Sequence, residues 1–133
     1  MKKLYELQLE IHQINKANGW HKYIPTPLEM HALFHTEITE AYIELQANRI
    51  DVWYQDDGKP EGYYVELADI VIRICDYAEL CGFIVGERDN YSELDYISIS
   101  DLHADISEAT ECVRNGGNKE DEFKILSRVV DRV

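Results

Sequence analysis

The chain is short of basic residues, cysteines and long apolar runs, and each shortage excludes a class of protein. Its 13 Lys and Arg stand against 26 Asp and Glu, so the formal net charge is −13. Such a chain lacks the basic surface that binds duplex nucleic acid or an anionic membrane, and neither is expected as a partner. No stretch approaches the roughly 20 apolar residues of a membrane-spanning helix.

The cysteines and the N-terminus indicate the compartment. Cys75, Cys81 and Cys112 cannot form a complete disulfide set, and no C-x-x-C pair offers a zinc site. The first residues mix apolar with charged and polar side chains, unlike the apolar core of a signal peptide. We therefore expect reduced thiols in a cytoplasmic protein. The length of 133 residues suits one domain, residues 1–133.

Apolar residues recur at helical spacing in five segments, whereas the alternation typical of strands is weak. Residues 49–60 carry turn formers and are expected to form a loop, with at most a short strand-like or helical piece, and residues 83–96 give no clear pattern. The recurring residues of the first segment are Leu4, Leu7, Ile11 and Ile14. The pattern predicts an all-α bundle of about five helices, over residues 2–18, 27–48, 61–82, 100–114 and 119–133.

Local signals set the expected helix ends. Thr26 can cap the second helix with Pro27 in its first turn, and Gly82 can end the third helix. Ser100 or Asp101 is the expected cap of the fourth helix.

The chain contains an internal similarity. Residues 34–41 (FHTEITEA) align with residues 102–109 (LHADISEA), with half of the pairs identical, and residues 67–73 align loosely with residues 126–132. Chance similarity between two acidic amphipathic helices is the alternative. A duplication is favoured because the histidine, the acids and a hydroxyl-bearing residue keep their register.

Two helices carry stripes of carboxylates. Glu37, Glu40 and Glu44 share one face of the second helix, and Glu66 and Asp69 share one face of the third, because residues three and four apart are neighbours. Antiparallel packing would place the stripes face to face. Composition alone favours the alternative, two solvated acidic faces. The acids nevertheless border the apolar sides and repel one another, which favours a cation site between them.

A site whose ligand atoms are all oxygens favours Mg²⁺, or Mn²⁺, over zinc. A di-iron carboxylate site would need Glu-x-x-His pairs, but the third positions here are the acids Glu40 and Asp69. An EF-hand loop beginning at Asp51 would place Asp56 where a glycine is needed and Gly62 where the bidentate glutamate belongs.

The second half of the duplication is expected to be degenerate. If residues 98–133 copy residues 30–76, Asp105 and Glu108 correspond to Glu37 and Glu40. The counterparts of Glu66 and Asp69 are then Ile125 and Arg128, which cannot complete an oxygen cage. Arg128 can instead pair with Asp105 or Glu108.

The paired motif Glu37-x-x-Glu40 and Glu66-Leu67-Ala68-Asp69 resembles the E-E-x-x-E … E-x-x-D signature of MazG-like proteins in the all-α NTP pyrophosphatase superfamily. The resemblance covers about residues 10–85. It extends to the segments HTEITEA (35–41), KPEG (59–62), ELADIVIRICD (66–76) and NGW (18–20).

The resemblance implies an all-α fold in which Glu37, Glu40, Glu66 and Asp69 hold Mg²⁺. It also implies hydrolysis of a nucleoside triphosphate to the monophosphate and pyrophosphate. Thr36 stands where the family has its first Glu, which leaves one role unassigned and raises the question of altered or lost activity.

A carboxylate must accept the proton of the attacking water, and Glu37 and Glu40 are equal candidates. Several further residues could contact the substrate through their charge or by stacking, and each also has a purely structural explanation. An arginine could form an ion pair, a lysine could lie in a solvated loop, and a histidine or an aromatic residue could pack in the fold. These candidates are Trp20, His35, Lys59 and Arg73, with Trp53 and Tyr54 as weaker ones.

The leading interpretation is a Mg²⁺-dependent nucleotide pyrophosphohydrolase that forms a homodimer or homotetramer, because a two-helix acidic seam would otherwise leave apolar area exposed. A relative that binds nucleotide or metal without turnover is the first alternative, motivated by Thr36. An acidic interaction protein is the second, motivated by the net charge alone.

Overall fold

A computed structural model describes residues 2–86 and 97–133 and confirms an all-α fold of five helices. A one-turn helix η1 (Trp20–Lys22) follows the first helix, and two short strands, β1 (Trp53–Tyr54) and β2 (Pro60–Glu61), pair antiparallel in the predicted loop. Every helix end lies within two residues of its predicted position, and most of the segment 83–96 lies outside the described residues. The helices are α1 (Leu4–Ala17), α2 (Pro27–Gln46), α3 (Tyr63–Cys81), α4 (Ile99–Arg114) and α5 (Lys119–Arg132).

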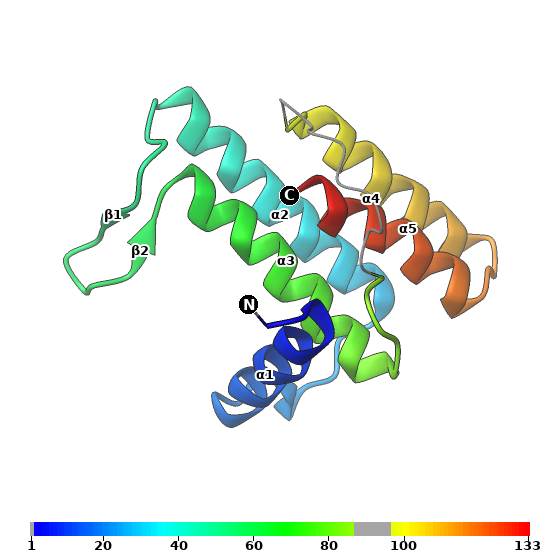
Figure 1. Ribbon diagram of the computed structural model, residues 1–133. Coiled ribbons are helices and arrows are strands. Elements are labelled where there is room, and N and C mark those ends of the chain that lie inside the picture. Colours follow the sequence, from blue (N-terminus) through cyan, green and yellow to red (C-terminus); the bar gives the residue numbers. More distant parts are fainter. Residues whose placement is uncertain (1, 87–96) are drawn as a thin grey trace.

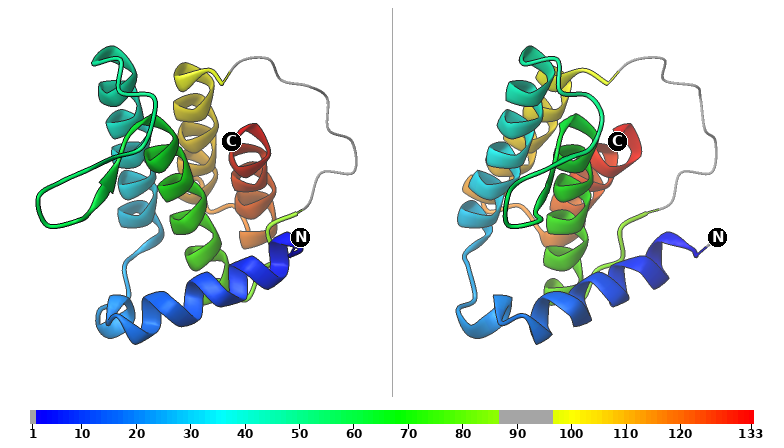
Figure 2. Two further views of the ribbon diagram at one scale, coloured as in Figure 1. Left: turned by 60° about the vertical axis from the view of Figure 1, so that its left-hand side comes forward. Right: turned by 90° about the vertical axis from the view of Figure 1, so that its left-hand side faces the viewer.

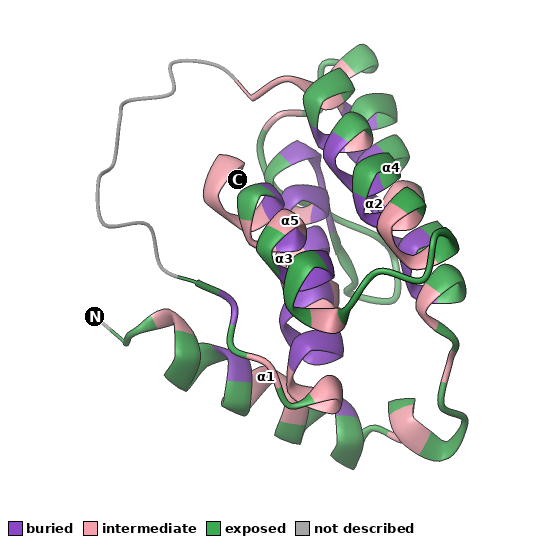
Figure 3. Ribbon diagram, turned by 90° about the vertical axis from the view of Figure 1, so that its right-hand side faces the viewer, coloured by how far each residue is buried: buried purple, intermediate pink, exposed green. Residues whose placement is uncertain are grey.

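The helices form two hairpins, α2–α3 and α4–α5, which pack through α2 against α4 and α3 against α5 (Figure 1). Helix α1 crosses the far end of α3, opposite the β1–β2 hairpin (Figure 2). Helix α3 is the central element and is buried along much of its length (Figure 3). The predicted apolar stripes of α2 and α3 supply much of the core, with Phe34, Ile38, Leu67, Ile70 and Ile74 all fully or almost fully buried.

The predicted capping residues are confirmed at two of the three helix ends. Thr26 caps α2 by accepting a hydrogen bond from the Glu29 amide, with Pro27 in the first turn, and Gly82 ends α3 in the left-handed conformation. The predicted caps of α4 were wrong. Ser98 performs this role, accepting a hydrogen bond from the Asp101 amide, so α4 begins one residue earlier than expected.

The buried face of α1 differs from the apolar pattern of its sequence. Ile14 is 53% exposed and Leu7 is also exposed, whereas Gln8 is buried. The side chain of Gln8 donates to the carbonyl oxygen of Phe83 at 2.7 Å and accepts from the Val85 amide at 3.0 Å. This glutamine satisfies backbone groups after α3 that would otherwise be buried without partners, which outweighs the burial of another leucine.

The two hairpins meet at equivalent residues of the internal repeat. His35 of α2 stacks on His103 of α4, with ring centroids 4.9 Å apart and Nδ1 atoms 2.6 Å apart. Burial lowers the pKa of both imidazoles, and for His35 the charge of His103 lowers it further. Aligned residues thus contact each other across the α2–α4 interface.

A buried polar network ties α2 and α3 to α5. Glu122 is 1% exposed and accepts hydrogen bonds from His31, Tyr77 and Lys119, each at 2.8 Å. Burial acts to raise the pKa of this carboxyl, but the hydrogen bonds from these three partners outweigh it and hold the pKa below its ordinary value. Three hydrogen bonds compensate the buried carboxylate for its loss of hydration, so this network stabilises the fold.

Gly62 fixes the start of α3 two residues after the predicted one. Glu61 pairs with Trp53 in the hairpin, and Gly62 follows with φ 125° and ψ 161°. A Cβ at this position would lie 2.5 Å from the carbonyl oxygen of Asp51. Only glycine therefore allows the hairpin and the first turn of α3 to meet.

Replacing Gly62 with alanine is expected to lower the free energy of unfolding by about 2–3 kcal/mol, because backbone strain and the contact with Asp51 act together. Gly58→Ala is the matched control. Gly58 also has a positive φ, 86°, but an added Cβ would meet nothing within 4 Å, so a loss of about 1 kcal/mol is expected. Urea unfolding of both variants measures the difference, and equal losses would contradict this account of Gly62.

Within the described residues, no helix has the length and apolar character needed to cross a membrane.

Cys75 is buried, Cys81 and Cys112 are half-buried, and all three are free thiols. Burial is the main cause that raises the pKa of Cys75, to about 12, so this thiol is inert at neutral pH.

Candidate metal centre

The α2–α3 hairpin gathers carboxylates from both helices at one place. Glu37 and Glu40 of α2 and Glu66 of α3 each have a carboxylate oxygen within 4.8 Å of the others. Asp69, one turn along α3, is half-buried and near enough for the charges of Glu37 and Glu40 to raise its pKa, after burial as the main cause. The antiparallel hairpin thus brings the two predicted acid stripes into one seam.

Glu66 is the unusual member of this group. Its side chain is 2% exposed, and its Oε2 atom has no hydrogen-bond partner among the described residues. Burial raises its pKa to about 8, and the adjacent Glu61 and the charges of Glu40 and Asp69 contribute. A buried carboxylate oxygen without a donor is costly, which indicates a place for a ligand that the protein alone does not supply.

Two cations border the carboxylates. Lys59, at the end of the β1–β2 hairpin, lies 2.6 Å from Glu61, in a pocket that Glu40 and Glu66 also line. Arg73 of α3 forms an ion pair with Glu37, and its guanidinium lies 5.2 Å from the ring centroid of Trp20. The ion pair considered as the alternative role of Arg73 is therefore present, with Glu37, and the charge of Arg73 also acts to lower the pKa of Asp69.

Glu44 and Trp53 line the same pocket as Glu40 and Glu66, but their polar groups are already paired. Both Glu44 oxygens bind Arg49, and one of them also accepts a hydrogen bond from the indole nitrogen of Trp53 at 2.8 Å. Arg49 also lies over the Trp53 ring. Tyr54 is exposed.

His35 and Thr36 lie near the carboxylates in sequence but face elsewhere. His35 contacts His103 and lines a different pocket from Glu40 and Glu66. The hydroxyl group of Thr36 donates to the carbonyl oxygen of Ala32 in its own helix, at 3.0 Å. Neither side chain belongs to the carboxylate cluster.

The second half carries one arginine, Arg128, where the alignment places Asp69 in the first half. Asp105 lies 2.6 Å from Arg132 and 3.5 Å from Arg128, and Arg128 also pairs with Glu108. The pairing of Arg128 expected from the alignment is therefore present. The pair of Asp105 and Arg132 joins residues that align with Glu37 and Arg73, which also form a pair, and intramolecular cations neutralise this second group of acids.

Sequence reasoning missed a second cluster. Asp76 of α3 accepts hydrogen bonds from His12 of α1 and His21 of η1, each at 3.0 Å. Its residues lie on three elements, so no spacing within one helix could reveal it. The available signal was an acid one turn beyond Arg73, beside the apolar side of the predicted helix, and two histidines flanking Asn18-Gly19.

The carboxylate seam has the donor chemistry of a Mg²⁺ or Mn²⁺ site. Its ligating atoms are oxygens, it combines buried and accessible carboxylates, and Glu66 Oε2 lacks any other partner in the described part of the chain. Glu37, Glu40 and Glu66 could hold the ion, with Asp69 one turn away. Comparisons with protein-family models, curated proteins and solved structures gave no match to this chain.

Proposed function

We propose that the protein is a Mg²⁺-dependent nucleoside triphosphate pyrophosphohydrolase of the MazG-like type. The observation that carries the proposal is Glu66, a buried carboxylate next to Glu37 and Glu40 whose Oε2 has no hydrogen-bond partner in residues 2–86 and 97–133. A structural role would not need three carboxylates to converge, because their mutual repulsion costs stability unless a cation is bound. When bound, Mg²⁺ would neutralise charge on the phosphate groups and orient them.

In this proposal, water attacks the α-phosphorus, the bond from that phosphorus to the oxygen bridging the α- and β-phosphates breaks, and pyrophosphate leaves. Glu40 is the better acceptor for the proton of the water. Glu37 is engaged by Arg73, whereas Glu40 has no hydrogen bond or ion pair with any described residue. Arg73 pairs with Glu37 and Lys59 pairs with Glu61, and both cations would contact the phosphate groups.

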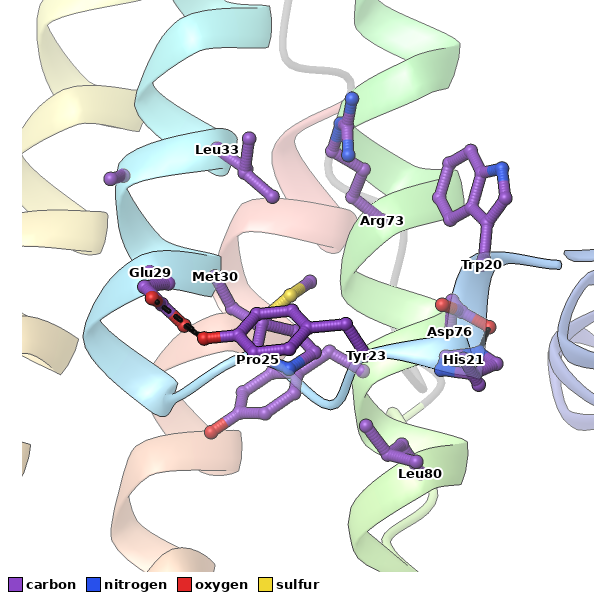
Figure 4. A pocket seen from close by; sticks show the side chains of 12 residues that line it. Trp20, His21, Tyr23, Pro25, Glu29, Met30, Leu33, Arg73, Asp76 and Leu80 are labelled. Atoms are coloured by element: carbon purple, nitrogen blue, oxygen red, sulfur yellow. Dashed lines mark hydrogen bonds and ion pairs between the residues drawn. The ribbon is translucent and has the colours of Figure 1, made fainter. Parts of the chain in front are cut away.

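A cavity beside Arg73 offers space for the nucleobase. It measures about 510 Å³, and its lining includes Trp20, Tyr23, Met30, Leu33 and Arg73 (Figure 4). This volume lies in the usual range for small-molecule sites, and the aromatic lining suits stacking on a base. Because Arg73 also pairs with Glu37, it connects the cavity to the carboxylates.

The direct test is incubation of the purified protein with each of the eight common ribo- and deoxyribonucleoside triphosphates and Mg²⁺. We expect equimolar monophosphate and pyrophosphate from at least one of them. Glu40→Gln should abolish the product, whereas Glu108→Gln, at the equivalent position of the second half, should not. Release of inorganic phosphate in place of pyrophosphate, or no product from any nucleotide, would contradict the proposal.

Thr36 supports a second candidate function, nucleotide binding without hydrolysis. This residue replaces the first Glu of the family signature, and its hydroxyl group is bonded to the helix backbone. Mg²⁺-dependent nucleotide binding without any pyrophosphate release would favour this candidate over the enzyme.

Mg²⁺ is expected to raise the melting temperature of the native chain in a concentration-dependent way, because a ligand that binds only the folded state stabilises it. The expected stabilisation is about 2.7 kcal/mol at 100 times the dissociation constant. Glu66→Gln should remove this response and Asp105→Asn should keep it. Differential scanning calorimetry with and without nucleotide measures the effect, and an unchanged melting curve up to tens of millimolar Mg²⁺ would remove the basis for a metal site.

The proposal includes a cytoplasmic homodimer or homotetramer. Three free cysteines suit a reducing compartment. Helices α1 and α2 expose large apolar side chains that a second copy could cover, namely Leu7, Leu9, Ile14, Leu33 and Ile43. Sedimentation equilibrium distinguishes this assembly from a monomer.

A further inference from the structure

A second cluster of ligand-type side chains lies outside the carboxylate seam, where α1 and η1 meet α3. His12 Nδ1 and His21 Nε2 are each 3.0 Å from the same oxygen, Asp76 Oδ1. The two imidazole rings lie side by side, with centroids 4.8 Å apart. Figure 4 shows His21 and Asp76 next to each other at one end of the cavity near Trp20.

The spacing of these atoms matches that of ligands around one ion. Tetrahedral zinc with bonds of about 2.0–2.1 Å separates its ligand atoms by about 3.3 Å. The three atoms already lie within 4.8 Å of one another, with two of their separations at 3.0 Å. Two of the separations thus differ from the tetrahedral value by about 0.3 Å, and the third is at most 4.8 Å.

Asp76 has a reason to bind a cation. It is 2% exposed, and its hydrogen-bond partners in the described residues are the two imidazoles. Arg73, one turn away on α3, is engaged by Glu37. A buried carboxylate requires a compensating positive charge, and imidazoles supply it only when protonated or when they share a metal ion with the carboxylate.

We propose that His12, His21 and Asp76 bind a divalent transition-metal ion of the zinc class. Two imidazole nitrogens and one carboxylate oxygen suit Zn²⁺, Co²⁺ or Ni²⁺ and disfavour Mg²⁺, which prefers oxygen ligands. Three protein ligands leave a fourth position for water. Because His21 and Asp76 line the cavity, this position would lie at the cavity wall.

The site would connect the N-terminal segment to the hairpin, since its ligands come from α1, η1 and α3. Coordination through Nε2 would place the remaining proton of His21 on Nδ1, which is buried and has no acceptor among the described residues. Zinc ligands normally donate this proton to a carboxylate or carbonyl group. We therefore expect a dissociation constant in the micromolar range rather than the nanomolar range of fully supported sites.

The test uses the full chain, stripped of metal and held in excess Mg²⁺ so that the carboxylate seam is saturated. Titration with Zn²⁺ should show one ion bound per chain and a higher melting temperature, and Co²⁺ should give the intense visible absorption of a tetrahedral site. His12→Gln, His21→Gln and Asp76→Asn should each weaken binding at least tenfold. His103→Gln, which alters a half-buried histidine elsewhere, should not change it.

Either of two results would overturn the proposal: the same Zn²⁺ affinity in all three ligand variants, or loss of Zn²⁺ binding in Glu66→Gln with retention in His12→Gln. Circular dichroism of each apo variant verifies its fold. If Asp76→Asn does not fold, the two histidine variants decide the matter, because both side chains lie near the surface end of the cluster. The test is independent of nucleotide hydrolysis, so failure of the proposed enzyme activity would leave it unaffected.

Discussion

Replacing Glu66 with glutamine is expected to reduce Mg²⁺-dependent nucleotide hydrolysis at least about 100-fold, a loss of about 2.7 kcal/mol of transition-state stabilisation. The amide cannot supply the second carboxylate oxygen, which has no hydrogen-bond partner among the described residues. The same change should make the metal-free protein more stable at pH 7 by about 1–2 kcal/mol, because a buried carboxylate crowded by Glu61, Glu40 and Asp69 is replaced by a neutral group.

This combination of lost activity and gained stability separates a ligand site from a structural one. A structural carboxylate would lose stability on substitution, and a surface one would change neither property. Steady-state kinetics and urea unfolding of the same preparation measure both. Glu66→Gln with full activity, or with marked destabilisation, would contradict the assignment of Glu66 as a metal ligand.

The second large effect is expected at Glu122. Its replacement by alanine should lower the free energy of unfolding by about 3–5 kcal/mol, because it leaves His31, Tyr77 and Lys119 without their common buried acceptor. Glu120→Ala, in the same first turn of α5 but exposed, is the control and should cost less than about 1 kcal/mol. Equal costs at the two positions would show that the network contributes little.

The contribution of Glu122 should also depend on pH. Its pKa in the folded protein is held below the ordinary value of 4.5, so the folded state favours the ionised carboxylate. The resulting stabilisation is fully present above pH 4.5 and is lost as the pH falls through the lower pKa of the folded state. The stability curves of the native protein and Glu122→Gln should therefore separate above pH 4.5 and approach each other below it.

The sequence was sufficient to predict the helices because local chemistry sets their limits. Thr26 with Pro27 starts α2 and Gly82 ends α3 through interactions within a few residues. The buried face of α1 was not predictable in the same way. Gln8 is buried because carbonyl and amide groups more than 70 residues away need partners, and no periodicity in α1 contains that information.

The candidate site also has one part that the sequence predicts and another that it does not. The stripes of Glu37, Glu40 and Glu66 follow from helical spacing, and antiparallel packing of neighbouring helices brings them together. The ion pair of Glu37 with Arg73 and the cluster of His12 with Asp76 depend on how side chains from distant segments meet. Such contacts are properties of tertiary packing.

The two aligned halves of the chain differ in the residues that surround their acids. Equivalent histidines meet at the α2–α4 interface, and equivalent acid–arginine pairs occur in both hairpins. The halves differ where Arg128 occupies the position that corresponds to Asp69 and pairs with Asp105 and Glu108. In the second hairpin a side-chain cation thus takes the place that we assign to a metal ion in the first.

The position of bound Mn²⁺ in a crystal of the native protein, located by its anomalous scattering, tests this account most directly. We predict a peak among Glu37, Glu40 and Glu66, and none beside Asp105 and Glu108, where Arg128 already supplies the positive charge. A peak between Asp105 and Glu108 with none at Glu66, or no ordered Mn²⁺ at either place, would contradict the assignment of the α2–α3 seam as the metal centre.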